Sequence, residues 1–246
     1  MTIRVVVSGT GKMGTEVVRA LAAEPDMEPA GTLDRSMDPE AFFSQSSADV
    51  VVDFTGAERA PVVALAALAA GVRPVIGTSG LKPDFLSQLD EKCRELGLGA
   101  VVAPNFALGA VIMMHIATLA APYFSHAEII EMHHDQKVDA PSGTALATAE
   151  AMAKRRKRPF QRNQPQRETL PGSRSAALEG VTIHSVRLPG LVAHQEVLFG
   201  APGQALTIRH DSLSRESFMP GVIAAIHWVM DSMELTIGLE KVLGLE

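Results

Sequence analysis

Strand-like and helix-like patterns alternate through the first hundred residues of this chain of 246 residues. Short apolar runs predict strands at residues 3–8, about 27–33, 49–54, 74–77 and 99–103. Helical patterns lie between these runs, at residues 12–23, 57–70 and 83–96. Strands that alternate with helices form a parallel sheet covered by helices on both faces. We therefore expect an α/β fold that begins with a Rossmann-like domain.

The second half of the chain has a different pattern, which predicts an α+β domain with an antiparallel or mixed sheet. Its strand-like runs lie at residues 127–132, 181–188, 193–199 and 204–210. Its helical patterns lie at residues 143–154 and 214–233. Residues 159–180 are rich in Pro, Gln, Arg, Ser and Gly, so we expect them to form a long loop.

The composition argues against several classes of partner. A net charge of −6 and an aromatic content of 4% leave neither a basic stripe nor stacking platforms for nucleic acid. The apolar stretches are too short to span a membrane, and the chain starts at a strand without a signal-peptide pattern. Cys93 is the only cysteine, so no intramolecular disulfide can form. We expect a cytoplasmic protein that binds neither nucleic acid nor membrane.

A glycine-rich loop follows the first predicted strand and opens the first predicted helix. It consists of Gly9, Thr10, Gly11, Lys12, Met13 and Gly14. This is the G-x-G-x-x-G spacing, in which glycines allow a tight turn and close approach to a pyrophosphate. Asp34 ends the next strand and suits the ribose hydroxyl of NAD, whereas Arg35 beside it suits the 2′-phosphate of NADP. The choice between NADH and NADPH stays open, as does an ordinary strand-end role for both residues.

Three further strands end in turn-rich segments, at residues 53–55, 77–80 and 103–106. Ligands of open α/β sheets bind at the carboxyl ends of the strands, so we expect these loops to line the nicotinamide end of the cofactor site. The residues predicted to touch the cofactor there are Gly77, Thr78, Ser79, Ala103, Pro104, Asn105 and Phe106.

The segment from Glu131 to Thr144 combines adjacent histidines, a lysine and a helix start. Histidine titrates near neutral pH, and the N-terminus of a helix binds carboxylates or phosphates. Ser142 suits the N-cap of the Ala-rich helix that follows. The segment therefore predicts an anion-binding site with acid/base groups.

Two other interpretations of these histidines are weaker. They could satisfy local hydrogen bonds only, although Lys137 and the helix start beside them disfavour that role. A metal site would have to draw on His133, His134, His184, His194 and Asp139. Adjacent histidines on a strand point to opposite faces and chelate one ion poorly, so we expect no metal.

The segment Glu131-x-His133-His134-x-x-Lys137-x-Asp139-Ala140-Pro141-Ser142-Gly143-Thr144-Ala145 resembles the signature of the dihydrodipicolinate reductase family. The glycine loop and five further short segments also appear in the order of that family: Asp53-Phe54-Thr55, Gly77-Thr78-Ser79-Gly80, Asn105-Phe106, Val186-Arg187 and Ser214-Arg215. The resemblance implies a Rossmann-like domain of residues 1–105 and 216–246. It implies a substrate-binding and tetramerisation domain of residues 106–215, and thus a homotetramer.

The resemblance also implies a role for each residue of the segment. His133 would be the acid/base group and Lys137 the proton donor. The carboxylates of a small cyclic dicarboxylate would be held by His134, Ser142, Gly143 and Thr144. NADH or NADPH would reduce 4-hydroxy-tetrahydrodipicolinate in the diaminopimelate and lysine pathway, and domain closure about residues 105–106 and 215–216 would exclude water. Two alternatives remain, namely another NAD(P)-dependent oxidoreductase, such as an amino-acid dehydrogenase, and a non-catalytic dinucleotide sensor.

Overall fold

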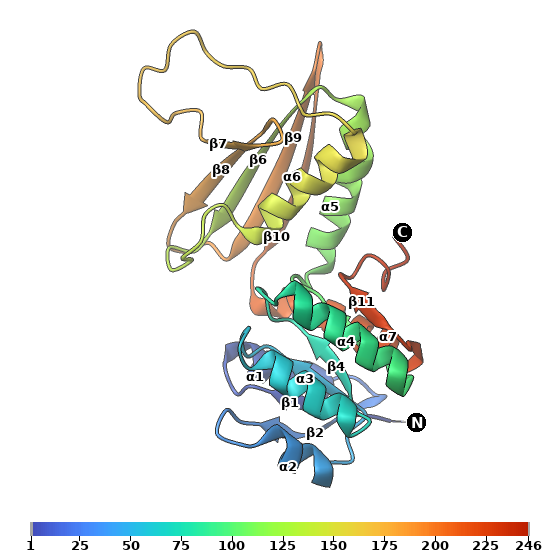
Figure 1. The fold of residues 1–246 in the computed structure, drawn as a ribbon. Helices are drawn as coiled ribbons and strands as arrows, with labels where there is room; N and C mark the ends of the chain where they lie inside the picture. Colours follow the sequence, from blue (N-terminus) through green and yellow to red (C-terminus); the bar gives the residue numbers. More distant parts are fainter. Residues whose placement is uncertain (1, 246) are drawn as a thin grey trace. The chain divides into compact units, whose positions relative to one another are not determined.

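The chain folds as two compact units (Figure 1). Unit 1 comprises Met1–Leu108 and Arg215–Glu246, and unit 2 comprises Gly109–Ser214. The computed structural model describes residues 2–245. Met1 and Glu246, both inside the predicted dinucleotide domain, lie outside the described residues.

Unit 1 contains a six-stranded parallel sheet with the order β11-β5-β4-β3-β1-β2. Its strands are β1 (Ile3–Ser8), β2 (Met27–Leu33), β3 (Val50–Asp53), β4 (Arg73–Ile76), β5 (Ala100–Val102) and β11 (Leu235–Ile237). The order of the strands reverses at β1, because β2 lies on one side of β1 and β3 lies on the other. This reversal is the topological switch point at which such sheets bind ligands.

Five α-helices belong to unit 1 within the described residues: α1 (Lys12–Leu21), α2 (Pro39–Gln45), α3 (Ala60–Ala69), α4 (Pro83–Leu96) and α7 (Met219–Asp231). Helices α2, α3 and α4 pack side by side, and their apolar residues form core clusters with the buried valines of the sheet. Helices α1 and α7 pack on each other and on the sheet. Helices layered on a parallel sheet in this way confirm the predicted Rossmann-like class.

Unit 2 contains a five-stranded mixed sheet with the order β10-β9-β6-β8-β7. Its strands are β6 (His126–His133), β7 (Ala176–Leu178), β8 (Val181–Arg187), β9 (Ala193–Ala201) and β10 (Gln204–Ser212). Strands β6 and β8 are parallel, and the other pairs are antiparallel.

One face of the unit 2 sheet is covered by α5 (Leu108–Ala120) and α6 (Gly143–Arg156), which Figure 1 shows on the same side. A short 3₁₀ turn, η1 (Ala121–Tyr123), follows α5. Alternate residues of β6, including Ala127 and Ile129, pack against Ala149 and Met152 of α6. Residues of the opposite parity, such as Ile130, therefore point away from these helices.

The structure corrects several sequence predictions. The predicted loop of residues 159–180 contains strand β7, whose three residues pair with β8. The predicted helix of residues 214–233 is divided into a 3₁₀ turn, η2 (Arg215–Phe218), and helix α7. Pro220 suits the first turn of α7, because proline lacks the N–H that a helix interior needs. Helices α2 and α5 are absent from the sequence prediction.

Candidate active site

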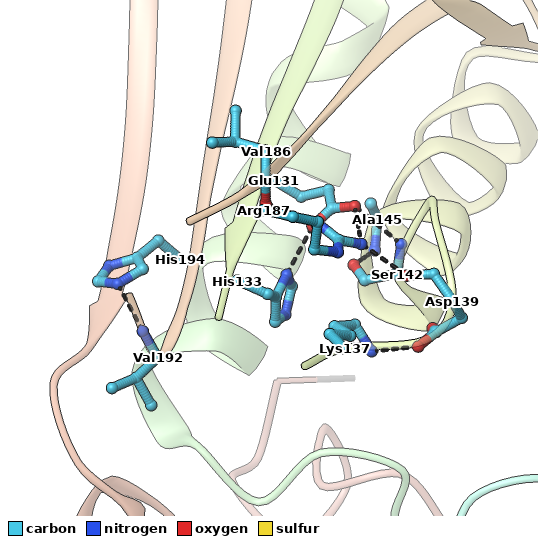
Figure 2. Close-up of polar contacts among 10 residues, drawn as sticks. All are labelled: Glu131, His133, Lys137, Asp139, Ser142, Ala145, Val186, Arg187, Val192 and His194. Carbon is cyan, nitrogen blue, oxygen red and sulfur yellow. Dashed lines mark hydrogen bonds and ion pairs between the residues drawn. The ribbon is translucent and has the colours of Figure 1, made fainter. Parts of the chain in front are cut away.

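The candidate site in unit 2 starts at the end of strand β6. The side chains of Ala127, Ile129 and Glu131 are buried on one face of this strand. His133 follows at the next position of the same parity and therefore projects to the same face. Figure 2 shows its ring turned toward the Glu131 carboxylate, and Nδ1 lies 2.5 Å from Oε2.

The Glu131 side chain is completely buried and is surrounded by hydrogen-bond donors. Arg187, at the end of β8, donates from Nη1 to Oε2 and from Nη2 to Oε1, each over 2.8 Å. The Ser142 backbone N–H donates to Oε1 over 3.1 Å. A buried carboxylate is tolerated only with such partners, because desolvation disfavours its charge.

These donors decide the charge state of Glu131. Burial alone would raise the pKa of the carboxyl, but the hydrogen bonds from His133 and Arg187 outweigh it and lower the pKa to about 2. Glu131 is therefore ionised at neutral pH and can only accept hydrogen bonds.

Lys137 lies in the loop between β6 and α6. Its Nζ donates to Asp139 Oδ1 over 2.7 Å, and this contact lowers the pKa of the Asp139 carboxyl. The backbone carbonyl of Asp139 accepts from Arg187 Nη2 over 2.6 Å. Arg187 therefore ties the loop that carries Lys137 to the carboxylate that holds His133 (Figure 2). His134, half-buried just after β6, accepts the Lys137 backbone N–H through its carbonyl.

Helix α6 begins beside this network. Ser142 is buried, and its Oγ accepts the Ala145 backbone N–H over 3.2 Å. The serine predicted as a substrate ligand thus uses both its hydroxyl and its amide inside the protein. A Cβ added at Gly143 would meet nothing within 4 Å, so there is open space at the first turn. The first N–H groups of a helix have no acceptor inside the helix, which makes a helix start a candidate anion site.

The glycine loop of unit 1 is tightly built at both ends and open in the middle. Gly9 has φ +96°, and a Cβ on Gly14 would lie 1.9 Å from the Gly9 carbonyl oxygen. Gly11 is the N-cap of α1, and a Cβ there would meet nothing within 4 Å. The loop therefore leaves an uncrowded helix start at the switch point of the sheet, which fits a dinucleotide pyrophosphate.

Asp34 and Arg35 directly follow β2. The Asp34 carboxylate accepts the Ser36 backbone N–H over 3.0 Å and the Ser36 hydroxyl over 2.8 Å, and these bonds lower its pKa. Arg35 is exposed. An oriented carboxylate and an exposed guanidinium are therefore adjacent. The choice between NADH and NADPH, which the sequence leaves open, stays open here as well.

The predicted strand-end segments of unit 1 lie close together. A Cβ on Gly77 would overlap the Phe54 ring, which itself lies 5.6 Å from the Phe106 ring between centroids. The buried Asp53 carboxylate accepts hydrogen bonds from the Thr55 hydroxyl over 2.9 Å and the Thr78 hydroxyl over 3.3 Å. The segments are therefore joined at one edge of the sheet.

The sequence patterns assign a role neither to Glu131, although it begins the signature segment, nor to Arg187. A signal that could have found the role of Glu131 is parity, because Glu131 occupies an inward position of a strand whose preceding inward residues, Ala127 and Ile129, are apolar. A charged residue at such a position requires a partner, but the sequence does not say which one. Arg187 is 56 residues away and meets it through the pairing of β6 with β8.

Two further features concern residues 2–245 as a whole. No group of three or more His, Cys, Asp or Glu side chains there is arranged to hold a metal ion. No helix in that range combines the length and the apolar character that crossing a bilayer requires.

A glycine-loop Rossmann unit and a mixed-sheet unit with a histidine–lysine site define a class of two-unit, nicotinamide-dependent oxidoreductases. Residues 3–106 match the family described as Dihydrodipicolinate reductase, N-terminus, and residues 109–243 match Dihydrodipicolinate reductase, C-terminus. The chain belongs to the dihydrodipicolinate reductase family.

Individual relatives agree with this assignment. The 4-hydroxy-tetrahydrodipicolinate reductase of Geobacillus thermodenitrificans is 47% identical, with 99% of this chain and 100% of the relative covered. The enzyme of that name from Bacillus subtilis is 44% identical, with 98% of each chain covered. The structure of dipicolinate-bound dihydrodipicolinate reductase from Paenisporosarcina sp. TG-14 has a TM-score of 0.90 at 44% identity, and the match covers 98% of this chain and 99% of that one.

Proposed function

We propose that this chain reduces 4-hydroxy-tetrahydrodipicolinate to tetrahydrodipicolinate with NAD(P)H, a step in diaminopimelate and lysine biosynthesis. The observation that carries the proposal is the His133 ring, held by a buried carboxylate next to an open helix start, in a chain of this family. An amino-acid dehydrogenase is not favoured, since the engineered D-amino acid dehydrogenase bound to NADP⁺ shares only the fold, at 14% identity.

Substrate binding is assigned to the start of α6 and to the loop before it. The relative from Paenisporosarcina binds dipicolinate, a planar ring with two carboxylates. In this chain the Gly143 and Thr144 backbone N–H groups would donate to one carboxylate at the positive end of the helix dipole. Lys137 and His134 would supply charge and hydrogen bonds for the carboxylates. Ser142 would act through the cap it forms rather than by direct contact.

Proton transfer is assigned to His133 and Lys137. Loss of water from 4-hydroxy-tetrahydrodipicolinate, in which the C4 hydroxyl leaves with a hydrogen from the carbon between C4 and the imine, would first give a ring whose imine is conjugated with a C=C bond. NAD(P)H, when bound, would supply the hydride that reduces this conjugated imine. The reduced ring then has an enamine carbon that must receive a proton, so a general acid is required nearby. His133 can donate through Nε2, while its Nδ1 faces Glu131. Lys137 can donate from an ammonium that Asp139 keeps oriented.

Cofactor binding is assigned to unit 1. The open helix start at Gly11 would receive the pyrophosphate, with residues 9–14 forming its cradle. Asp34 would accept the ribose hydroxyls of NADH, and Arg35 would pair with the 2′-phosphate of NADPH. Residues 77–79 and 103–106 would contact the nicotinamide end. We therefore propose that the enzyme uses both coenzymes.

We also propose a cytoplasmic homotetramer that assembles through the mixed sheet of unit 2. Within unit 2, helices α5 and α6 cover one face of this sheet. The other face carries apolar side chains such as Ile130, Met132 and Leu198, which are half-buried in the single chain. Contact between such faces would remove these side chains from water.

A coupled assay with freshly prepared substrate, run with NADH and NADPH in parallel, tests the activity and the coenzyme proposal together. His133→Ala and Lys137→Ala should each lower kcat by about 10²-fold or more, which is the usual contribution of a general acid. NADH affinity, followed by fluorescence titration, should stay within about 3-fold because both residues belong to unit 2.

The exposed residues His227 and Lys92 of unit 1 provide matched controls. His227→Ala and Lys92→Ala should keep wild-type kcat. Wild-type turnover in both His133→Ala and Lys137→Ala would refute the assignment of proton transfer. Oxidation of neither coenzyme in the presence of substrate would refute the proposed activity.

A further inference from the structure

We infer that Glu131, balanced by Arg187, is a positioning residue that keeps His133 in the Nδ1–H tautomer and leaves Nε2 to exchange protons with the substrate. The inference deepens the proposed function and rests on it for the identity of the proton acceptor. It assigns a role to a buried ion pair that the proton-transfer assignment above does not use.

The tautomer follows from the acceptor that His133 meets. Oε2 of Glu131 lies 2.5 Å from Nδ1, and an ionised carboxylate has no proton to donate. Nδ1 must therefore carry the hydrogen in both the neutral ring and the imidazolium. The two ring nitrogens lie on opposite sides of an imidazole, so Nε2 is directed away from the carboxylate. The His133 side chain is 15% exposed, so part of it remains accessible although Nδ1 faces a buried carboxylate.

Arg187 makes this arrangement possible in a buried location. Its two terminal nitrogens donate to the two carboxylate oxygens, so the plane of the Glu131 carboxylate is set by a bidentate pair. The pair is electrically neutral, which allows the carboxylate to remain ionised although its side chain is 0% exposed. With the plane fixed, the direction of the His133 hydrogen bond is fixed as well.

The same pair also positions the second proton-handling group and the helix start. Glu131 Oε1 accepts the Ser142 N–H, where α6 begins. Arg187 Nη2 donates to the Asp139 carbonyl, and Asp139 Oδ1 accepts from Lys137. The loop of residues 134–142 is thus held at its end and near its middle by one ion pair. Glu131 thereby couples the orientation of the acid groups to that of the carboxylate-binding helix.

Proton transfer in this arrangement leaves the Glu131 hydrogen bond intact. The Nε2–H bond of the imidazolium breaks, and a C–H bond forms with the electron pair of the enamine carbon. The ring becomes a neutral imidazole that keeps Nδ1–H on Glu131, and water later returns a proton to Nε2. In the inverted neutral tautomer the hydrogen is already on Nε2, so donating it would turn the ring into an imidazolate, and the Nδ1 lone pair would face the carboxylate.

The test combines ¹⁵N NMR of the histidine rings with steady-state kinetics on Glu131→Gln. The His133 signals are assigned by their loss in His133→Asn. In the wild-type protein we expect the Nδ1–H tautomer of His133 at a pH where the ring is neutral. In Glu131→Gln a carboxamide NH₂ can face the ring, so the Nε2–H tautomer should become populated. The kcat value should fall by about 10² or more, with KM changed less than about 3-fold.

A second variant separates positioning from folding, because Glu131→Gln leaves Arg187 without its counter-charge. Glu131→Gln with Arg187→Met removes both charges, so this double variant should fold and bind NADH while still showing low kcat and the altered tautomer. Glu128→Gln is the matched control, since Glu128, on the same strand, holds His184 and Arg174 instead. It should leave the His133 signals unchanged.

The outcomes distinguish this inference from the proposed function. An Nε2–H tautomer of His133 in the wild-type protein would overturn the inference, as would wild-type kcat in a folded double variant. If the wild-type protein showed the Nδ1–H tautomer without reducing the substrate, the proposed function would fail. The tautomer would then still support the role of Glu131 in orienting His133.

Discussion

At the residue scale, the buried ion pair of Glu131 and Arg187 should be costly to break in terms of the free energy of unfolding. Removing one partner of a buried ion pair leaves an uncompensated charge, which usually costs about 3–5 kcal/mol. We predict that Arg187→Met lowers the free energy of unfolding by about that amount, measured by urea denaturation. The double variant with Glu131→Gln should recover most of the loss. A cost for Arg187→Met below about 1 kcal/mol would contradict this description of the pair.

The pKa of Glu131 predicts an acid dependence of stability. Its pKa in the folded protein is about 2, below the ordinary value of 4.5. A lowered pKa stabilises the folded state above the unfolded pKa, and this stabilisation is lost as pH falls through the folded pKa. Glu131 should therefore contribute on the order of 3 kcal/mol near neutral pH, since one pKa unit corresponds to about 1.4 kcal/mol.

Urea unfolding between about pH 5 and about pH 2 measures this contribution, because the loss occurs in that interval. The free energy of unfolding should fall less steeply with decreasing pH in the double variant than in the wild-type protein, since neither the introduced glutamine nor the introduced methionine titrates. Parallel curves for the two proteins would show that the Glu131 pKa is not lowered by folding.

At the element scale, the start of α1 contains two glycines with opposite surroundings, the N-cap Gly11 and Gly14 in the first turn of the helix. A Cβ on Gly14 would lie 1.9 Å from a backbone oxygen, whereas one on Gly11 would meet nothing within 4 Å. We predict that Gly14→Ala lowers the free energy of unfolding by about 1–3 kcal/mol, as overpacking usually does. Gly11→Ala should cost less than about 1 kcal/mol.

For the Gly11→Ala variant, we expect a larger effect on coenzyme affinity than on stability. The methyl group of Gly11→Ala would occupy the space in which the pyrophosphate approaches the helix start, so NADH affinity should fall by about 10-fold or more. Fluorescence titration and thermal unfolding of both variants check the two effects. Unchanged NADH affinity in Gly11→Ala would argue against this loop as the pyrophosphate site.

The predicted and observed elements differ where the sequence lacks periodicity. Helix α5 reads Leu-Gly-Ala-Val-Ile-Met-Met-His-Ile-Ala-Thr-Leu-Ala, so polar residues do not mark an outer face. Strand β7 is three residues long and exists because β8 offers a pairing edge. By contrast, helix α4 is predicted with its observed bounds, Pro83–Leu96, because a proline and a glycine mark its ends.

At the scale of the whole molecule, the proposed tetramer can be tested through the sheet of unit 2. Ile130 lies on β6, the central strand, and points away from helices α5 and α6. Ile130→Lys would place a charge in the proposed contact, so we expect sedimentation velocity to report a species smaller than a tetramer. Val62, an exposed valine of α3 in unit 1, is the control, and Val62→Lys should keep the wild-type mass. A tetramer in Ile130→Lys would contradict assembly through this face.

The sequence by itself determined the class of fold, the glycine loop and the segment from Glu131 to Thr144, because these depend on local periodicity and on short spacings. The tertiary structure decided which side chains act together. His133 meets Glu131 through the two-residue period of a strand, but Arg187 reaches Glu131 only because β8 lies beside β6. Sheet pairing joins residues far apart in the chain, and no local pattern specifies that pairing. The sequence therefore predicts the acid/base and anion-binding groups of the segment, but it does not predict the ion pair that orients His133.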